Sequence, residues 1–287
     1  MKIAIYGSLA ILMTAALSCS DSSGELRVLL AAEETISHGL QAGTGEENTK
    51  DYGVSYSKFL VVIGAVKLGR SDPRRARSSD AAFIADMRQV GEEGQEIVSF
   101  DSLLPGQWNL FGYQTPVALA SSRYEVLPGV DGADAREMVD KQLTYWIEGT
   151  VERPGKPVSF VFKVAVPTTY SDCETNGKPG VSVGEGGAST ATITLHGDHL
   201  WFDSLVRGDE STVSRRTQWL VDADVDGDGK VVTEDLAKVP AEVVFPSSQG
   251  YNLSGGPIPV ATALDFVRGQ LATQGHLDGE GECETLL

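Results

Sequence analysis

The sequence predicts a mainly β protein, in which an antiparallel β-sandwich over residues 25–205 precedes a small helical module over residues 206–287. Three observations carry this prediction. Short apolar or alternating runs separated by Gly and Pro turns fill most of the chain up to residue 205. Beyond that point, apolar residues recur at helical spacing. An acidic loop with alternating aspartates lies between two of the expected helices.

Seven strand regions are expected, each bounded by turn residues. The clearest signal is a hairpin in which two β-branched and aromatic runs meet across residues 153–157. Residues 71–88 carry several arginines in an otherwise acidic chain. We expect a solvated loop with a helical turn there, with a surface for a phosphate-rich or acidic partner as the alternative. The expected strands are Leu26–Ala31, Val54–Val62 running into Ala65–Leu68, Ile97–Phe100, Gln107–Tyr113, Leu143–Val151, Val158–Val166 and Thr190–His196.

Three helices are expected after residue 205. One begins near Ser211 and covers STVSRRTQWLVDAD, and a short one covers EDLAKV. The longest, IPVATALDFVRGQLATQ, places most of its apolar side chains on one face. We expect these helices to pack at the end of the sandwich as one module.

Residues 1–18 have the composition of an export signal. Lys2 precedes an apolar run that is too short to span a bilayer. The stretch Ala16–Cys19 resembles the lipobox of bacterial lipoproteins. This resemblance implies that residues 1–18 are removed, that Cys19 carries a lipid, that residues 19–24 form a tether, and that the protein lies in the bacterial cell envelope. Ser20 in place of aspartate favours the outer membrane. An ordinary secretory signal with an incidental cysteine is the alternative.

Cys173 and Cys283 are the two cysteines outside this N-terminal stretch. In an oxidising compartment an even pair is more often bonded than free, so we expect a disulfide between them. Both lie in Gly-rich, acidic sequence, which disfavours the alternative of two separate buried thiols. A closure of this length would contribute about 4 kcal/mol in the chain-entropy model and would tie the acidic C-terminal tail to the body.

The chain is strongly acidic, with 23 basic and 40 acidic residues and a formal net charge of −17. Phosphate backbones attract the opposite sign, so nucleic acid is not an expected partner. An anionic surface favours solubility and attracts cations. We expect a monomer held to a membrane through its N-terminal lipid, and the sequence identifies no protein partner.

The motif with the highest information content is DADVDGDGKVVTEDL. Alternating carboxylates followed by Gly229 supply oxygen ligands around a tight turn, as a hard cation such as Ca²⁺ requires. The motif resembles the calcium loop of EF-hand and dockerin proteins. Val232 at the ninth position and an aspartate at the twelfth predict weak or moderate affinity. Asp222 could compete as the first ligand, and an empty acidic turn is the alternative. The ligands that the resemblance implies are the side chains of Asp224, Asp226, Asp228 and Asp235 and the carbonyl of Lys230.

Two of the four histidines follow an expected strand in the stretch LHGDHLWFDSL. On a continuing strand, His196 and Asp198 would point one way and His199 the other. A bulge at Gly197 would bring both histidines to one side. His276 is the best candidate to complete a site, because the expected disulfide would draw its segment back to this strand. A Zn, Cu or Fe site and a purely structural strand end are the two alternatives.

The order of three segments, FDSLLPGQWNLFGYQ, YWIEGTVERPGKPVSFVFKV and TITLHGDHLWF, is similar to the layout of periplasmic copper-associated β-sandwich proteins of the methanobactin-linked kind. It also looks like a set of uncharacterised bacterial lipoproteins that combine an HGDH-type strand end with an Asp-rich loop and a Gly-Glu-Gly-Glu-Cys tail. The first resemblance implies copper ligation by His196 and His199 and extends to no other residue.

The sequence carries no G-x-S-x-G, H-E-x-x-H, P-loop or C-x-x-C-H motif, so it predicts a binding or structural protein rather than an enzyme. The first expected function is that of a lipid-anchored, calcium-binding protein of the cell envelope. The alternative is a periplasmic transition-metal binding or handling protein that uses His196 and His199, with Asp198 and His276 as supporting groups. Convergence of the imidazole nitrogens would favour the alternative. A large exposed apolar patch would favour a third class, an adhesion or assembly protein.

Overall fold

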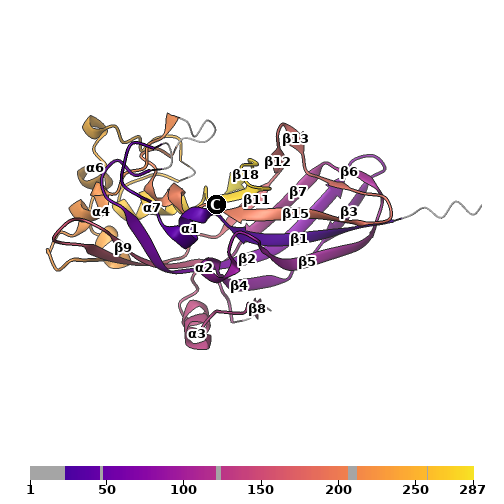
Figure 1. The fold of residues 1–287 in the computed structure, drawn as a ribbon, viewed down its shortest axis with the longest axis horizontal. Coiled ribbons are helices and arrows are strands. Elements are labelled where there is room, and N and C mark those ends of the chain that lie inside the picture. Colours follow the sequence, from indigo (N-terminus) through magenta and orange to yellow (C-terminus); the bar gives the residue numbers. More distant parts are fainter. Residues whose placement is uncertain (1–22, 46–47, 121–123, 206–211, 257) are drawn as a thin grey trace, which may run out of the picture.

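The computed structural model describes residues 23–45, 48–120, 124–205, 212–256 and 258–287. The export segment, Cys19 and the helix start expected near Ser211 lie outside these residues. The described chain is mainly β, as predicted. Figure 1 shows strands filling one end of the molecule and most of the helices gathered at the other. No helix in the described ranges is long and apolar enough to cross a membrane.

The smaller of the two main sheets has the strand order β17-β15-β1-β5. β1 (Gly24–Ala32) and β15 (Ala188–Leu195) pair in parallel, in a register that places Ala32 beside Leu195. β5 (Gln95–Leu103) and β17 (Gly275–Leu277) pair antiparallel on the two outer sides. The carboxyl ends of β1 and β15 therefore lie next to each other.

The larger sheet is built around the long strand β2 (Val54–Arg70), in the order β16-β10-β9-β2-β7-β11-β18. The two runs expected in this region form one strand, which continues through register shifts and has Ala65 at φ 52°. β3 and β4 pair with β2 off this path, and β8 pairs with β4. The other members are β3 (Arg75–Ser78), β4 (Ala82–Asp86), β7 (Leu110–Thr115), β8 (Tyr124–Val126), β9 (Tyr145–Val151), β10 (Val158–Val164), β11 (Thr168–Ser171), β16 (Lys230–Val232) and β18 (Glu284–Leu286).

Sequence periodicity located most strands but not the direction of every pairing. The expected hairpin is confirmed as β9 and β10, with Tyr145 paired to Val164. The run expected over Gln107–Tyr113 divides at Asn109 into β6 (Gly106–Trp108) and β7. The pairs β1–β15, β10–β16 and β4–β8 are parallel, so the sheets are mixed rather than antiparallel throughout. Long connections permit parallel neighbours, and a residue pattern does not record strand direction.

The expected helical turn is present at the end of the segment 71–88, but the prediction of a solvated loop before it was wrong. The segment forms β3, β4 and the short helix α2 (Met87–Val90). Phe83 and Ile84 are buried, so β4 carries apolar side chains that a solvated loop would leave in water. β3, by contrast, exposes all four of its residues.

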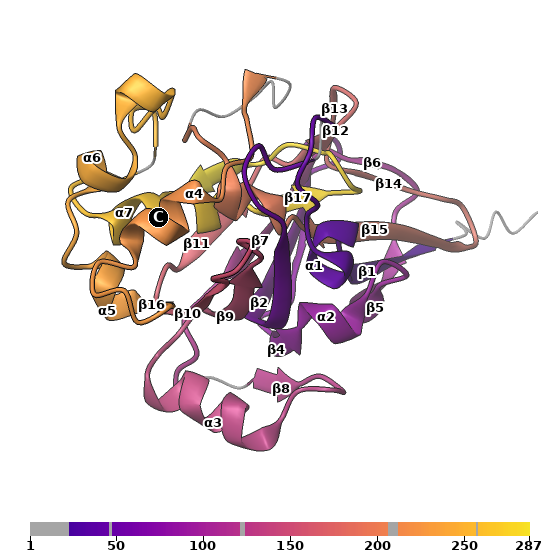
Figure 2. The same ribbon diagram turned by 60° about the vertical axis from the view of Figure 1, so that its left-hand side comes forward.

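Helices and strands alternate in the C-terminal part of the chain (Figure 2). α7 (Ala263–Leu271) lies inside the longest expected helix, and Thr262 and Asp265 form a capping box at its start. α4 (Gln218–Ala223) and α5 (Thr233–Leu236) flank the aspartate-rich loop. Strands β16, β17 and β18 extend both main sheets, and the expected division near residue 205 stays a prediction. The remaining short elements are α1 (Glu34–His38), α3 (Gly132–Asp140), η1 (Asp198–Trp201), α6 (Ala241–Val244), η3 (Ser247–Gln249), β12 (Glu174–Thr175), β13 (Lys178–Pro179) and β14 (Val181–Val183).

One large hydrophobic core joins both main sheets to the C-terminal helices. Val28 of β1, Phe59 of β2 and Phe266 of α7 all belong to it and are almost fully buried. A smaller core cluster lies on the opposite face of β2, beneath α3. The expected disulfide is confirmed, because Cys173 and Cys283 are bonded to each other. This bond holds the C-terminal tail against the strands.

Candidate metal centre

The candidate centre lies at one edge of the smaller sheet, where three segments distant in sequence meet. Glu33 follows the last residue of β1, and its backbone N–H donates to the carbonyl of Leu195 at 3.0 Å. His196 follows the last residue of β15. His276 lies on β17, where it pairs with Thr194 of β15. The parallel register of β1 and β15 and the antiparallel strand beside them therefore bring these side chains to one place.

His196 and His199 share a side because the strand stops between them. β15 ends at Leu195, Gly197 has helical backbone angles (φ −75°, ψ −23°), and the 3₁₀ turn η1 follows. Residues three apart eclipse each other in a 3₁₀ turn, so both imidazoles point the same way. The two histidines therefore share a side through a 3₁₀ turn, and neither a continuing strand nor a bulge at Gly197 describes this segment. Tyr56 Oη donates to the Gly197 carbonyl at 2.6 Å and fixes this turn.

The three imidazoles of His196, His199 and His276 form one buried cluster, with 2 to 3% of each residue exposed. One ring nitrogen from each lies within 4.8 Å of the others. The ring centroids of His196 and His276 are 4.1 Å apart, and those of His199 and His276 are 5.0 Å apart. His38 lies elsewhere, with its side chain 68% exposed beside Glu92. Three of the four histidines therefore converge.

Hydrogen bonds fix the orientation of two of the rings. His196 Nε2 lies 3.1 Å from the carbonyl of Gly279, which can only accept, so Nε2 carries the proton and Nδ1 the lone pair. His199 Nδ1 lies 3.0 Å from Thr273 Oγ1, and that hydroxyl donates its own proton to the Gln270 carbonyl at 2.8 Å. His199 Nδ1 is therefore a donor to this hydroxyl. Ligating histidines in proteins are oriented by such partners.

Two carboxylates lie beside the imidazoles. Asp198 is 1% exposed and accepts from Arg215 Nε at 2.6 Å, within a buried ion pair. Glu33 accepts from Thr35 Oγ1 at 2.6 Å, and its other carboxylate oxygen lies 3.7 Å from His196 Nδ1. Donor atoms of Glu33, His196 and Asp198 lie within 4.8 Å of one another, so a second possible set of ligands shares His196 with the first.

Burial controls the protonation of the centre. Burial, together with the neighbouring imidazole of His199, lowers the pKa of His196, and burial lowers the pKa of His276 well below its usual value. A histidine must be neutral to bind a metal, so the lowered pKa values of these two rings favour the binding form. Burial and the charge of Asp198 raise the pKa of Glu33 to about 8. Burial opposes ionisation of Asp198 as well, but nearby positive charge, including that of its paired Arg215 guanidinium, outweighs burial and lowers the pKa of Asp198.

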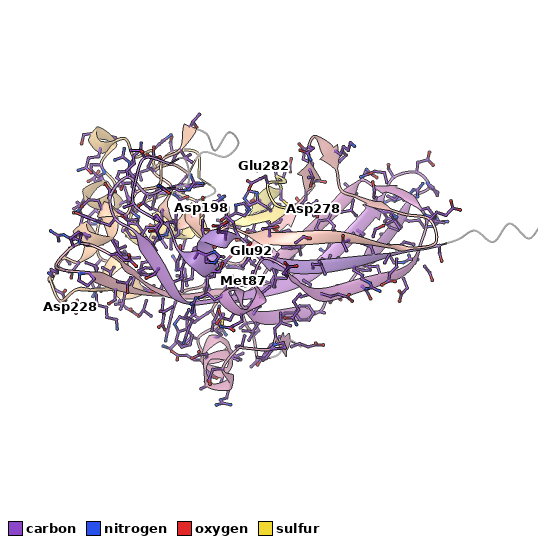
Figure 3. All side chains as sticks on the ribbon, in the orientation of Figure 1. Met87, Glu92, Asp198, Asp228, Asp278 and Glu282 are labelled. Atoms are coloured by element: carbon purple, nitrogen blue, oxygen red, sulfur yellow. A yellow bond between two sulfur atoms is a disulfide. The ribbon has the colours of Figure 1, made fainter. Side chains whose placement is uncertain are left out.

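The aspartate-rich loop lies in a different part of the molecule, and Figure 3 shows Asp228 far from Asp198. Carboxylate oxygens of Asp224, Asp226 and Asp228 lie within 4.8 Å of one another. Gly227 and Gly229 have φ angles of 73° and 83°, a backbone region that glycine adopts without strain. The loop backbone therefore gathers the first three expected ligands.

The other residues considered for this loop have different surroundings. Asp235 accepts from the Val232 N–H at 3.0 Å and caps α5, and it does not belong to the three-carboxylate group. Lys230 begins β16, which pairs with β10. Asp222 accepts from Gln218 Nε2 at 2.8 Å, one helical turn before it. Lys156 Nζ lies 3.8 Å from a carboxylate oxygen of Asp224, so the loop already has one cationic neighbour.

Sequence reasoning missed Glu33, Thr273 and Arg215 as neighbours of the histidines. The signal for Glu33 is a carboxylate immediately after an expected strand, but its meaning depends on the parallel pairing of β1 with β15. No family model, no curated protein and no solved structure matches this chain. The geometry of the two clusters is therefore the basis for assigning a function.

Proposed function

We propose that this chain binds a transition-metal ion through His196, His199 and His276, as a protein of the bacterial cell envelope. The observation that carries the proposal is the convergence of three buried imidazoles from two chain segments about eighty residues apart. Asp198 supports the turn between the first two ligands through its ion pair with Arg215. A role in metal binding or handling, without catalysis, is the function that this arrangement supports best.

A purely structural role accounts less well for the same geometry. Histidines that only terminate a strand would each need one protein partner, and nothing would require their rings to face one another. Burying three imidazoles side by side costs desolvation free energy, which a shared cation would offset. The contacts of His196 with Gly279 and of His199 with Thr273 orient these two rings, as protein partners orient the histidines of metal sites.

The donor set limits the choice of metal. Three imidazole nitrogens suit zinc, copper or iron, and both described cysteines are committed to a disulfide rather than available as thiolates. Three protein ligands leave a further position for a carboxylate, water or a guest molecule. We expect a metal ion that accepts imidazole ligands, such as Zn²⁺ or a copper ion, rather than one that requires thiolate ligands.

Elemental analysis tests this proposal on protein exported through an oxidising periplasm and purified without chelator or a histidine tag. We expect near-stoichiometric zinc, copper or iron that is lost in His199→Ala and retained in Asp224→Ala. Because His199→Ala also removes buried contacts, circular dichroism and thermal unfolding should accompany it. Wild-type protein that remains folded and takes up none of these metals on titration would refute the proposal.

A calcium site in the loop 224–235 is the second candidate. The observation in its favour is the gathering of Asp224, Asp226 and Asp228 around a turn with two left-handed glycines. We propose an EF-hand-like Ca²⁺ clip that fastens the helical module, residues 206–287, onto a sandwich formed by the two main sheets. β16 follows this loop directly and pairs with β10, so ordering the loop would stabilise that junction.

Thermal unfolding in Ca²⁺ tests the second candidate. At a hundredfold excess over Kd, binding to the folded state alone would add about 2.7 kcal/mol. We expect Ca²⁺ to raise Tm in the wild type and to have little effect on Asp226→Asn. A wild-type Tm that does not respond to Ca²⁺ at millimolar concentration would refute the clip.

The cell-envelope location rests on the N-terminal sequence. We propose that Cys19 carries the lipid and that the protein is held at the outer membrane. Mass spectrometry of protein purified from membranes should find residues 1–18 removed and a lipid on Cys19. Cys19→Ser should move the protein from the membrane fraction to the soluble fraction.

A further inference from the structure

The hairpin of β2 and β3 concentrates positive charge in a chain whose net charge is −17. Between residues 67 and 77 there are five basic side chains and one carboxylate, that of Asp72. Every residue from 71 to 78 is exposed. The basic side chains are Lys67, Arg70, Arg74, Arg75 and Arg77, which we call the basic hairpin.

The fold makes little use of these charges. Arg75 and Arg77 donate to the carbonyls of the residues just before them, at 2.9 and 3.0 Å. Arg70 donates to the carbonyls of Asp72 and Pro105, both at 2.8 Å. Across the described ranges, none of the five side chains forms an ion pair with a carboxylate. The positive charges are thus left for an external anion.

Protection of a sheet edge does not account for the whole cluster. β3 pairs only with β2, and charged side chains on such an edge strand discourage pairing with other chains. That role requires charge on β3 itself. Lys67, Arg70 and Arg74 lie outside β3, on β2 and in the turn.

The basic hairpin lies at the end of the molecule where the described chain begins. Its residue Arg70 reaches the carbonyl of Pro105, just after β5, and Leu103 at the end of β5 pairs with Gly24 at the start of β1. Figure 1 shows β3 and β6 toward one end of the strands, away from most of the C-terminal helices. The cations and Gly24, at the start of β1, therefore lie toward one end of the molecule.

The length of the tether limits how far this end can be from a membrane. A lipid on Cys19 would leave five residue steps to Gly24, a reach of about 18 Å at full extension. Electrostatic attraction to a charged surface decays over about 8 to 10 Å at physiological salt. The anchored end can therefore bring its cations within range of the headgroups.

We propose that the basic hairpin docks on the anionic headgroups of a bilayer, an inference that rests on the lipid anchor proposed above for Cys19. Leu110 on the neighbouring strand β7 is 47% exposed and leans across Gly69, beside a groove of about 690 Å³ that Lys67 and Arg77 help to line. An apolar side chain next to cations suits the boundary between headgroups and acyl chains. The surface orients the protein and is separate from metal binding.

Hydrogen exchange on the full chain in vesicles tests this orientation. Exchange of peptides covering residues 67–78 should be at least tenfold slower in vesicles containing a third phosphatidylglycerol than in pure phosphatidylcholine, since each basic residue near an anionic surface strengthens binding about fivefold. High salt should abolish the difference. Peptides covering α3 serve as the internal reference.

Two charge-reversed variants with equal net charge separate docking from general attraction. Arg74→Glu/Arg75→Glu should lose the protection, whereas Arg136→Glu/Lys238→Glu, at exposed sites elsewhere, should keep it. Equal exchange in the two kinds of vesicle, or equal loss in both variants, would overturn the proposal. Protection by added polyglutamate but not by anionic vesicles would assign the hairpin to an acidic polypeptide instead and would also overturn it.

Discussion

The histidine centre and the aspartate loop present two ways of building a candidate cation site in one chain. The histidines are buried and come from segments that β15, η1 and β17 bring together. The three aspartates lie within five consecutive residues, and two of them are exposed. One set of donors exists only when the whole fold is formed, whereas the other depends mainly on a local turn.

Because the two sites are built differently, different substitutions should damage each of them. The buried centre depends on the strand register, on the disulfide that holds the tail, and on partners such as Thr273 that orient the rings. The exposed loop depends on its glycines and on the balance of nearby charges. Changes far from the ligands should therefore affect the histidine centre and leave the aspartate loop largely unchanged.

Removal of the disulfide should have the largest effect. Cys173 and Cys283 close a loop of 110 residues, so Cys173→Ser/Cys283→Ser should lower the free energy of unfolding by about 4 kcal/mol. His276 and Gly279 lie on the segment that this bond holds, so zinc affinity should fall as well. Ca²⁺ affinity of the loop should stay within about twofold, since a surface change away from a site shifts free energies little. Urea unfolding and separate titrations with Zn²⁺ and Ca²⁺ measure the three effects. An equal loss of affinity for both ions would contradict the division between the sites.

A methyl group on Gly197 should disturb the turn between the two histidines. A Cβ there would lie 2.6 Å from Ile36 Cγ1 and 3.2 Å from Thr35 Oγ1, and Ile36 is fully buried. Overpacking of this kind costs about 1 to 3 kcal/mol, so Gly197→Ala should be destabilised by that amount and should bind zinc more weakly. Gly187→Ala is the control, because nothing lies within 4 Å of its added Cβ. Denaturant unfolding compares the two variants. Unfolding midpoints that agree would show that the turn can absorb the methyl group.

The contrast also explains which parts of the structure the sequence could predict. The alternation of apolar and polar residues predicted most strands, and the even number of cysteines outside the N-terminal stretch predicted the disulfide. The expected disulfide then favoured His276 over His38 as the third histidine of the centre. Glu33 could not be predicted in the same way, because its position beside His196 depends on the parallel register of β1 and β15. The 3₁₀ turn after Leu195 was also missed, because a short apolar run does not record where its pairing ends. The aspartate loop was readable because its donors are contiguous.

Loss of the Thr273 hydroxyl should weaken zinc binding without unfolding the protein. The hydroxyl accepts from His199 Nδ1, so Thr273→Val removes a partner that orients this ring. Partners of this kind are worth about 10- to 100-fold in metal affinity. Thr273→Ser should retain near wild-type affinity because it keeps the oxygen. Competition with a chromogenic chelator measures the difference. Equal affinities for the valine and serine variants would mean that this hydrogen bond does not orient the ligand.

The smallest effect should come from Lys156, the cationic neighbour of the aspartate loop. Its Nζ lies 3.8 Å from Asp224 and donates to the Gly227 carbonyl at 3.1 Å, but the lysine side chain is 54% exposed. Exposed pairs contribute about 0.2 to 1 kcal/mol, so removing the competing charge in Lys156→Met should raise Ca²⁺ affinity by about twofold to threefold. Lys178→Met, on the exposed strand β13, should leave it unchanged. Zinc affinity should not respond to either variant, because the histidine centre is buried and distant from this loop. Calcium titration at low and high salt measures the effect, which screening should diminish. A weaker affinity in Lys156→Met would show instead that the lysine holds the loop in its binding conformation. The aspartate loop would then depend on its neighbour β10 and would not be a purely local site.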